Sequence, residues 1–246
     1  MISTISLTFG GMTAEASLRP QPRPPGLHVT ATAQWDFRAE GKDWTDAALA
    51  ALRDHGGPLV RETPRDITDW CPGYRGAPDA ARRAFWVGFM SALAFHESSW
   101  RPDAVGGNGA WYGLLQILPA TARGYGCRAQ SGDDLKDGGD NLSCAVRIMA
   151  VTVPRDGVVH AQYPRWGGVS ADWGPMRSEV RRAQMARWVR AQPYCQLWAS
   201  PPPRERPDPG RWVQGPRISA LRPQPRPTPA APSRLAAAQT LASARR

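Results

Sequence analysis

The sequence predicts a mainly α-helical protein with a single folded domain, and three observations lead to this prediction. First, a long apolar segment repeats Trp86, Met90 and Leu93 at helical spacing. Second, the stretches 43–52 and 141–151 also have the composition of helices. Third, the alternating apolar and polar pattern that strands require is weak throughout. A helical fold around one core is therefore the simplest architecture.

The composition divides the chain into three parts. Residues 1–43 and 200–246 contain long stretches rich in Pro, Arg and Ala and poor in large aliphatic side chains. Such segments bury too little apolar surface to offset the entropy lost on folding, so we expect both to be disordered. Residues 44–199 remain as the folded domain, which is long enough for one sizeable core.

Helix boundaries follow from capping residues and from Pro and Gly. The first helix is predicted to begin near Asp43 and to stop at Gly56, and the segment 56–78 is predicted to be a loop. The best-supported helix begins near Asp79 and carries the apolar segment. Further helices are predicted to open at Pro119, to run from Asn141 to about Val151 before Pro154, and to begin near Pro175 with Met176, Val180 and Trp188 facing inward.

The net charge of +10 is concentrated at one end of the chain. Residues 200–246 hold nine Arg against Glu205 and Asp208, a balance of +7. A basic tail of this kind can hold a protein near an acidic cell wall, an anionic lipid or a nucleic acid, although arginine-rich composition alone would also produce it. Apart from Trp212 the tail lacks aromatic residues for base stacking, so nucleic acid is not an expected partner.

The chain has four cysteines, and no two of them have the CxxC spacing of a zinc or redox site. An even number of cysteines fits two disulfides and an oxidising compartment, with reduced buried cysteines as the alternative. Three pairings are possible. We expect Cys127–Cys144, which would tie a loop to the next helix, and Cys71–Cys195, which would join the two ends of the domain.

Export is expected from the cysteines, yet the N-terminal segment does not resemble a signal peptide. It lacks a basic region, and its apolar stretch is short and interrupted. No stretch of the sequence approaches the length of a membrane span. The expected location is therefore the periplasm or another exported compartment, with no signal peptide evident in the sequence as given.

Glu97 is the strongest catalytic candidate. It continues the stripe formed by Trp86, Met90 and Leu93, and a buried carboxyl group tends to stay protonated near neutral pH, as a general acid must. The alternative is a Glu at the helix end that points to water. Trp100 stands where the HExxH zinc motif needs its second histidine, so no metal or other cofactor is expected.

Three motifs occur in a recognisable order: Glu97-Ser98, then 113–117 (Gly-Leu-Leu-Gln-Ile) with a following Pro and Thr-Ala, then Asn141-Leu142. Together they resemble the lytic transglycosylase family with the soluble lytic transglycosylase (SLT), goose-lysozyme-like domain. The resemblance implies a lysozyme-like helical fold and peptidoglycan glycan strands as substrate. It also implies cleavage between N-acetylmuramic acid and N-acetylglucosamine to a 1,6-anhydro product, with Glu97 as acid and then base.

The same resemblance implies a set of substrate-binding residues. These are Ser98, Gly113, Leu114, Gln116 and Asn141, of which Leu114 is expected to pack under the helix and Asn141 could equally orient a turn. Two tryptophans that flank the glycine-rich loop, Trp100 and Trp111, are candidates for stacking on sugar rings. Tyr163 is a weak match to a tyrosine that the family places near the acid.

Gly106 departs from the family pattern, because members commonly carry a Ser nine residues after the Glu. This departure concerns the binding of the substrate more than the class of reaction. Two alternatives to the transglycosylase also stay open: a goose-type muramidase that hydrolyses the same bond, and a non-catalytic wall-binding protein. The protein is expected to be a monomer, and its basic tail is a possible contact for wall or envelope partners.

Overall fold

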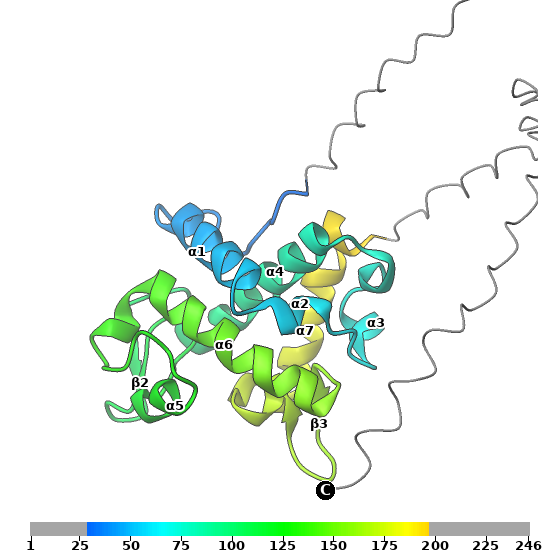
Figure 1. Ribbon diagram of the computed structural model, residues 1–246. Coiled ribbons are helices and arrows are strands. Elements are labelled where there is room, and N and C mark those ends of the chain that lie inside the picture. Colours follow the sequence, from blue (N-terminus) through cyan, green and yellow to red (C-terminus); the bar gives the residue numbers. More distant parts are fainter. Residues whose placement is uncertain (1–28, 197–246) are drawn as a thin grey trace, which may run out of the picture. The chain divides into compact units, whose positions relative to one another are not determined.

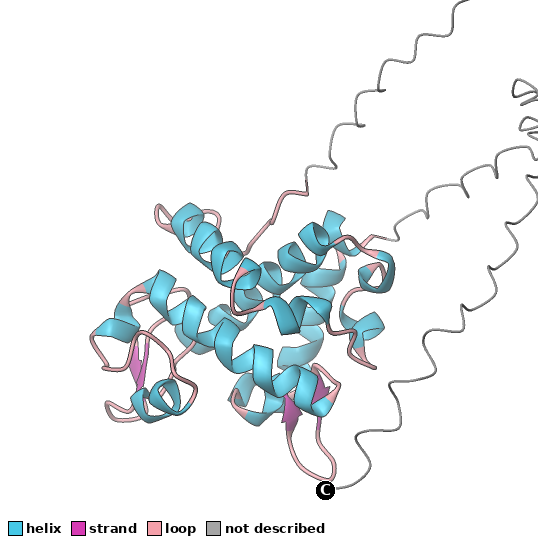
Figure 2. Ribbon diagram, viewed as in Figure 1, coloured by secondary structure: helices cyan, strands magenta, loops and turns pink. Residues whose placement is uncertain are grey.

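The computed structural model describes residues 29–196, which form a mainly helical domain as predicted (Figures 1 and 2). The helices are α1 Gly41–Arg53, α2 Gly57–Arg61, α3 Ile67–Trp70, α4 Asp79–Ser98, α5 Pro119–Gly124, α6 Gly138–Asp156 and α7 Glu179–Arg190. Short 3-10 turns are η1 Tyr74–Gly76, η2 Asp134–Lys136, η3 Val169–Ala171, η4 Gly174–Arg177 and η5 Pro193–Cys195. The strands are β1 Val105–Gly106, β2 Trp111–Tyr112, β3 His160–Ala161 and β4 Gly167–Gly168.

Helix α4 is the centre of the core and begins at Asp79, as predicted. The side chains of Trp86, Met90 and Leu93 are completely buried, which confirms the apolar stripe. The helix ends where Ser99 adopts the left-handed conformation, with φ of 53°. This change of direction leaves Glu97 in the last turn of a helix whose middle part, residues 84–94, is buried in the protein.

Helix α6 runs past Pro154 to Asp156, so the prediction that Pro154 ends it is wrong. The proline lies in the last turn, where its missing N–H removes a single backbone hydrogen bond. The Gly157 N–H still donates to the Val153 carbonyl at 2.8 Å, and Gly157 closes the helix with φ of 66°. At the other end, the Asp137 side chain caps the helix by accepting from the Asp140 N–H.

The first and last predicted helices are confirmed with shifted starts. Helix α1 begins at Gly41, while α7 begins only at Glu179, because the Ser178 side chain caps it and the preceding residues form η4. Met176 is buried as predicted. Val180 is 67% exposed in the first turn of α7, so the prediction that its side chain faces inward is wrong. The segment 56–78 contains α2, α3 and η1 and is not a simple loop.

The core begins earlier in the chain than residue 44. Trp35 is completely buried, packs edge-on against Trp44, and donates its indole N–H to the Thr45 hydroxyl at 2.9 Å. The expectation of disorder is therefore wrong for residues 29–43, because one large aromatic side chain there finds a place in the core. The predictions for residues 1–28 and 200–246 concern residues outside the described part.

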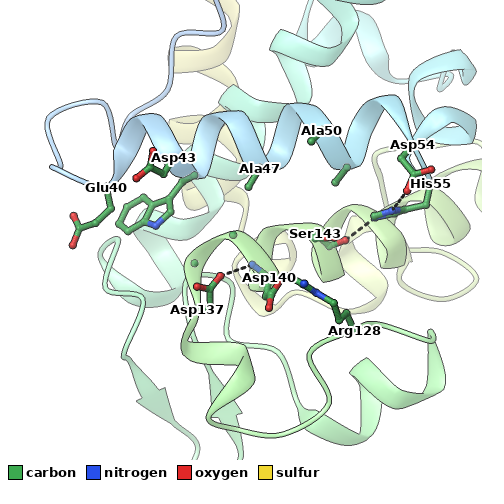
Figure 3. Close-up of a pocket in the computed structure, with 14 residues that line it drawn as sticks. Glu40, Asp43, Ala47, Ala50, Asp54, His55, Arg128, Asp137, Asp140 and Ser143 are labelled. Carbon is green, nitrogen blue, oxygen red and sulfur yellow. Dashed lines mark hydrogen bonds and ion pairs between the residues drawn. The ribbon is translucent and has the colours of Figure 1, made fainter.

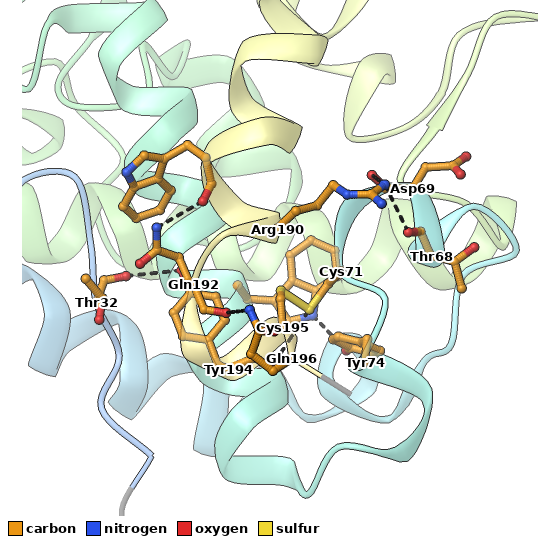
Figure 4. Close-up of a disulfide and its surroundings, with 12 residues drawn as sticks. Thr32, Thr68, Asp69, Cys71, Tyr74, Arg190, Gln192, Tyr194, Cys195 and Gln196 are labelled. Atoms are coloured by element: carbon orange, nitrogen blue, oxygen red, sulfur yellow. Dashed lines mark hydrogen bonds between the residues drawn. A yellow bond between two sulfur atoms is a disulfide. The ribbon is translucent and has the colours of Figure 1, made fainter. Parts of the chain in front are cut away.

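Both expected disulfides are confirmed. Cys71, just after α3, joins Cys195 in η5, and the Gly73 N–H donates to the Cys195 carbonyl at 3.0 Å beside the bond (Figure 4). The second disulfide joins Cys127, after α5, to Cys144 in α6. The first bond therefore closes the domain across most of its length, and the second holds the loop after α5 against α6.

Two short antiparallel hairpins stand at opposite ends of α6 (Figure 1). The β1–β2 hairpin is bound to the start of α6 through Asn141, whose side-chain amide donates to the Tyr112 carbonyl at 3.0 Å. The β3–β4 hairpin is bound to its end, since the Gly168 N–H donates to Asp156 at 2.8 Å. None of the helices among residues 29–196 has both the length and the apolar character needed to cross a membrane.

Candidate active site

Residues 113–116 form a segment, here called the strap, that three separate elements hold in place. The Ser98 hydroxyl of α4 donates to the Leu114 carbonyl at 2.9 Å. The Leu115 N–H donates to Asn141 of α6 at 2.9 Å, and the Trp173 indole N–H donates to the Leu115 carbonyl at 3.0 Å. Through Ser98, the residue directly after Glu97, the strap is fixed relative to the end of α4.

Gly113 begins the strap, and no other residue fits there. Its φ of 81° lies in the left-handed region that favours glycine. A Cβ at this position would also lie 2.0 Å from the Leu135 carbonyl oxygen and 2.3 Å from the Asn141 side-chain nitrogen. The glycine of the motif therefore allows the backbone to approach α6 closely enough for Asn141 to hold the strap.

Glu97 presents a half-buried carboxyl group at the end of α4. Burial raises its pKa to about 7, and the positive charge of Arg181 in α7 works against this rise. Among residues 29–196 the carboxyl group has no hydrogen-bond or ion-pair partner. A carboxyl group in this state is protonated for part of the time near neutral pH, as proton donation requires.

Gln116 is held in a bent conformation at the end of the strap. Its φ is 47°, and its side-chain nitrogen donates to the carbonyl groups of Ala104 at 3.1 Å and Gly113 at 2.9 Å. A Cβ at Gly106 would lie 2.3 Å from the Gln116 side-chain oxygen. Gly106, which stands where the resemblance leads one to expect Ser, thus leaves room for the Gln116 amide. The missing side chain at position 106 and the positive φ of Gln116 are parts of the same local arrangement.

The two candidate tryptophans lie in different surroundings. Trp111 is 47% exposed, and its ring covers Gly107, where a Cβ would lie 2.0 Å from the ring carbons. Trp100 is half-buried, donates to the Ser91 carbonyl at 2.8 Å, and contacts the ring of Phe95 with ring centroids 4.9 Å apart. Helical spacing places Phe95 on the side of α4 opposite to Glu97. Trp111 is therefore the accessible ring near the strap.

Four of the sequence candidates are buried and either belong to the strap or hold it in place. Ser98, Leu114 and Asn141 have at most 4% of their surface exposed, and Gly113 is buried beside them. The Asn141 amide donates to the Tyr112 and Leu135 carbonyls and accepts from Leu115, so its hydrogen-bonding capacity is largely used. In the structure these residues hold the strap, and their direct contact with substrate stays a prediction.

Tyr163 does not join the other candidates. It is 83% exposed in the loop between β3 and β4, where it lines a groove with Arg65, Pro164 and Arg165. Neither Glu97 nor Gln116 lines that groove. The position after the β3 strand therefore does not supply a tyrosine to the strap.

A small pocket lies directly beside the strap, and it contains residues that the sequence did not indicate. Its volume is about 80 Å³. It is lined by Trp111, Gln116, Ile117, Leu118, Thr121, Ile148, Asp172 and Trp173. Asp172 and Trp173 follow η3, far along the chain from Glu97, and no motif or spacing marks them. Only the packing of η3 against α6 brings them to the strap.

A larger groove of about 690 Å³ runs between α1 and α6 and does not include Glu97 or any residue of the strap (Figure 3). It carries several carboxylates, among them Asp140, which pairs with Arg128, and a half-buried histidine, His55, whose ring bonds to the Ser143 carbonyl at 2.9 Å. Within residues 29–196 no three His, Cys, Asp or Glu side chains lie close enough together to hold a metal ion.

Comparison with known proteins identifies part of the chain. Residues 78–157 match the family model described as the transglycosylase SLT domain. No curated protein matches the chain in sequence. The solved structure of wild-type DslA is 28% identical with a TM-score of 0.62, and the match covers 68% of this chain and 100% of that one. Two glutamate-to-glutamine variants of DslA match similarly. One is 28% identical with a TM-score of 0.62, and the match covers 68% of this chain and 100% of that one. The other is 29% identical with a TM-score of 0.61, and the match covers 67% of this chain and 97% of that one.

Proposed function

We propose that this chain, whose residues 78–157 carry a transglycosylase SLT domain, is a peptidoglycan lytic transglycosylase with Glu97 as its single acid and base. The observation that carries the proposal is the half-buried Glu97 carboxyl with a pKa of about 7. Glu97 is also the only glutamate in residues 78–157. The DslA variants, in which glutamates were replaced, are consistent with an acid of this type.

The reaction would need one proton donor that later becomes a proton acceptor. Protonated Glu97 donates to the glycosidic oxygen as the bond from the anomeric carbon of N-acetylmuramic acid breaks. The carboxylate then takes the proton of the muramoyl 6-hydroxyl while that oxygen bonds to the anomeric carbon. The products are a 1,6-anhydro sugar and a free 4-hydroxyl group, and Glu97 ends protonated as it began. No water is consumed.

The pKa of Glu97 suits both halves of this cycle. At a pKa of about 7 the protonated and ionised forms are both populated near neutral pH, so the same group donates and accepts readily. A carboxyl group in water, with a pKa near 4.5, would be almost entirely ionised there. Burial at the end of α4 is therefore the property that the proposed mechanism needs most.

We further propose that the protein acts outside the reducing cytoplasm and that its catalytic unit is the predicted domain 44–199 together with residues 29–43. Two disulfides persist only where the compartment is oxidising. The bond between Cys71 and Cys195 encloses the whole SLT segment. Peptidoglycan is the substrate that an SLT domain implies, and it lies in such a compartment.

The test is digestion of purified sacculi by the oxidised full chain, with fragments analysed by mass spectrometry. The unaltered protein is expected to release muropeptides that end in 1,6-anhydro-muramic acid. Glu97→Gln keeps the shape of the side chain but cannot donate a proton, and we expect it to release none. Glu179→Gln, a change at an exposed glutamate of α7, serves as the matched control and is expected to keep full activity.

The products decide between the proposal and its alternatives. Fragments with reducing ends would identify a goose-type muramidase, which uses water. Binding to sacculi without fragments, by a protein whose far-ultraviolet circular dichroism shows a helical fold, would identify a non-catalytic wall-binding protein.

A further inference from the structure

The small pocket beside the strap contains both engaged and free hydrogen-bonding groups. The side-chain nitrogen of Gln116 is already used by two backbone carbonyls, and the Trp173 indole N–H is used by the Leu115 carbonyl. The carboxylate of Asp172 has no hydrogen bond or ion pair with any described residue. The pocket therefore offers two acceptors, Asp172 and the Gln116 side-chain oxygen. Two of its donors are engaged, while the Thr121 hydroxyl and the Trp111 indole N–H have no hydrogen bond among the described residues and remain as donors.

Apolar side chains and the hydroxyl of Thr121 make up the rest of the lining. Ile117 and Ile148 are buried and contribute to the wall together with Leu118. Trp111 stands at the edge with nearly half of its surface exposed. A pocket of about 80 Å³ admits a substituent of a few heavy atoms and not a whole sugar ring. An occupant that complements it is small, donates a hydrogen bond, and belongs to a ring that can lie against Trp111.

We propose that this pocket receives the nitrogen-bearing substituent at carbon 2 of a hexosamine ring, with the N–H donated to Asp172. The inference rests on the proposed function, because it identifies the group of the glycan strand that the site recognises. Asp172 is thereby a specificity-determining residue that contacts substrate. It takes no part in the proton transfers of Glu97.

The surroundings of Asp172 support a role in binding. Burial raises the pKa of Asp172, and the positive charges of Arg155 and Arg177 work against this rise. Arg155 is itself engaged with Asp156 at 2.8 Å, and Arg177 donates to the carbonyls of Ser170 and Ala171. Asp172 is exposed, and its carboxylate has no donor among the described residues, so it is free to accept an N–H from a ligand.

The nitrogen could belong to an acetamido group or to a free ammonium group, and two substitutions separate these sources. Asp172→Asn retains a carbonyl oxygen that accepts a hydrogen bond but loses the negative charge. Asp172→Leu has a similar shape and retains neither. If an acetamido group is bound, Asn retains most of the affinity; if an ammonium group is bound, both substitutions lose it.

The experiment measures the affinity of the full chain for short β-1,4-linked oligomers by isothermal titration calorimetry. All proteins carry Glu97→Gln so that no oligomer is cleaved. The three probes are oligomers of N-acetylglucosamine, of glucosamine and of glucose, which differ only at carbon 2. Asp133→Leu, at an exposed carboxylate outside the pocket, is the matched control.

We expect Asp172→Leu to bind at least one of the two hexosamine oligomers about tenfold more weakly, which corresponds to ~1.4 kcal/mol, and to bind the glucose oligomer unchanged. The control should match the parent for all three probes. Equal loss for the glucose oligomer, or no loss for either hexosamine oligomer, would overturn the inference.

A second measurement, digestion of sacculi with Glu97 present, keeps the inference separate from the proposed function. Asp172→Leu should raise KM and leave kcat within about twofold. A fall in kcat with KM unchanged would overturn the binding role and indicate a catalytic one. If the unaltered protein releases no fragments, the proposed function fails. The inference fails as well if, in addition, the hexosamine oligomers bind no better than the glucose oligomer; if they bind better, the inference stands without the proposed function.

Discussion

Asn141 and Leu115 are joined across the core by a buried hydrogen bond, in which the Leu115 N–H donates to the Asn141 side-chain oxygen at 2.9 Å. The same amide also donates to the Tyr112 and Leu135 carbonyls. One completely buried side chain at the start of α6 therefore fixes both the strap and the β1–β2 hairpin.

The first prediction concerns this amide. Asn141→Ala should lower the free energy of unfolding by about 2–4 kcal/mol, because it leaves two buried backbone groups, the Leu115 N–H and the Leu135 carbonyl, without partners. Urea denaturation followed by circular dichroism measures the loss. Arg147→Ala, a change on the same helix at a side chain with no hydrogen bond among the described residues, should cost less than about 1 kcal/mol. Equal effects of the two substitutions would contradict the assigned role of Asn141.

The pH dependence of activity should be governed by Glu97 and adjusted by Arg181. The acid form of Glu97 is lost as the pH rises through its pKa of about 7, so activity should fall above that pH. Arg181 lowers this pKa, and Arg181→Gln should therefore move the alkaline limb of the profile to higher pH. The rate of fragment release from sacculi between pH 5 and 9 measures the shift. An unchanged profile would show that Arg181 does not act on the acid.

The pH dependence of stability that comes from Glu97 should have the opposite sign to that of a typical carboxylate, whose pKa is lowered on folding. The pKa of Glu97 is raised in the folded state from 4.5 to about 7, so the folded protein holds its proton more tightly than the unfolded chain does. This contribution is fully present below pH 4.5 and is lost as the pH rises through about 7. Glu97→Gln should therefore unfold at a higher temperature than the parent at pH 8, with a smaller difference at pH 4.5. A constant difference between the two pH values would exclude the linkage.

The two disulfides should differ in their contributions. Cys71 and Cys195 are separated by 124 positions, and Cys127 and Cys144 by 17. Loop-closure entropy predicts losses of about 5 kcal/mol and about 3 kcal/mol, respectively, when each pair is replaced by Ser. Chemical denaturation of the two double variants under oxidising conditions compares them. A larger loss for the shorter loop would mean that local packing outweighs the entropy of the unfolded chain.

Gly106→Ser should disturb Gln116 directly. The new Cβ would lie 2.3 Å from the Gln116 side-chain oxygen, so the amide must move from its bonds to Ala104 and Gly113. We expect KM for sacculi to rise about threefold or more, since a displaced Gln116 alters the wall of the pocket. Gly76→Ser has no atom within 4 Å of its new Cβ and is the matched control. Equal KM values for the two variants would show that the position of Gln116 does not matter for binding.

Much of the helical framework was predictable because its signals are local. The spacing of Trp86, Met90 and Leu93 indicates one buried helix face, and the starts at Asp79 and Pro119 follow from the chemistry of a first turn. The end of α6 was not predictable in this way. Pro154 lies in its last turn, where the loss of one hydrogen bond is tolerated by a helix that is packed along most of its length.

The sequence by itself was enough to predict the helical class, two disulfides from four cysteines, and Glu97, Gly113 and Gln116 as candidate site residues. Each of these predictions depends only on residue type and short spacing. The tertiary structure alone decided which candidates reach the surface. It buries Ser98 and Asn141 as supports, leaves Trp111 exposed, and brings Asp172 to Gln116. Contacts of this kind depend on how helices pack, and packing sums many weak interactions between distant residues that no local pattern records.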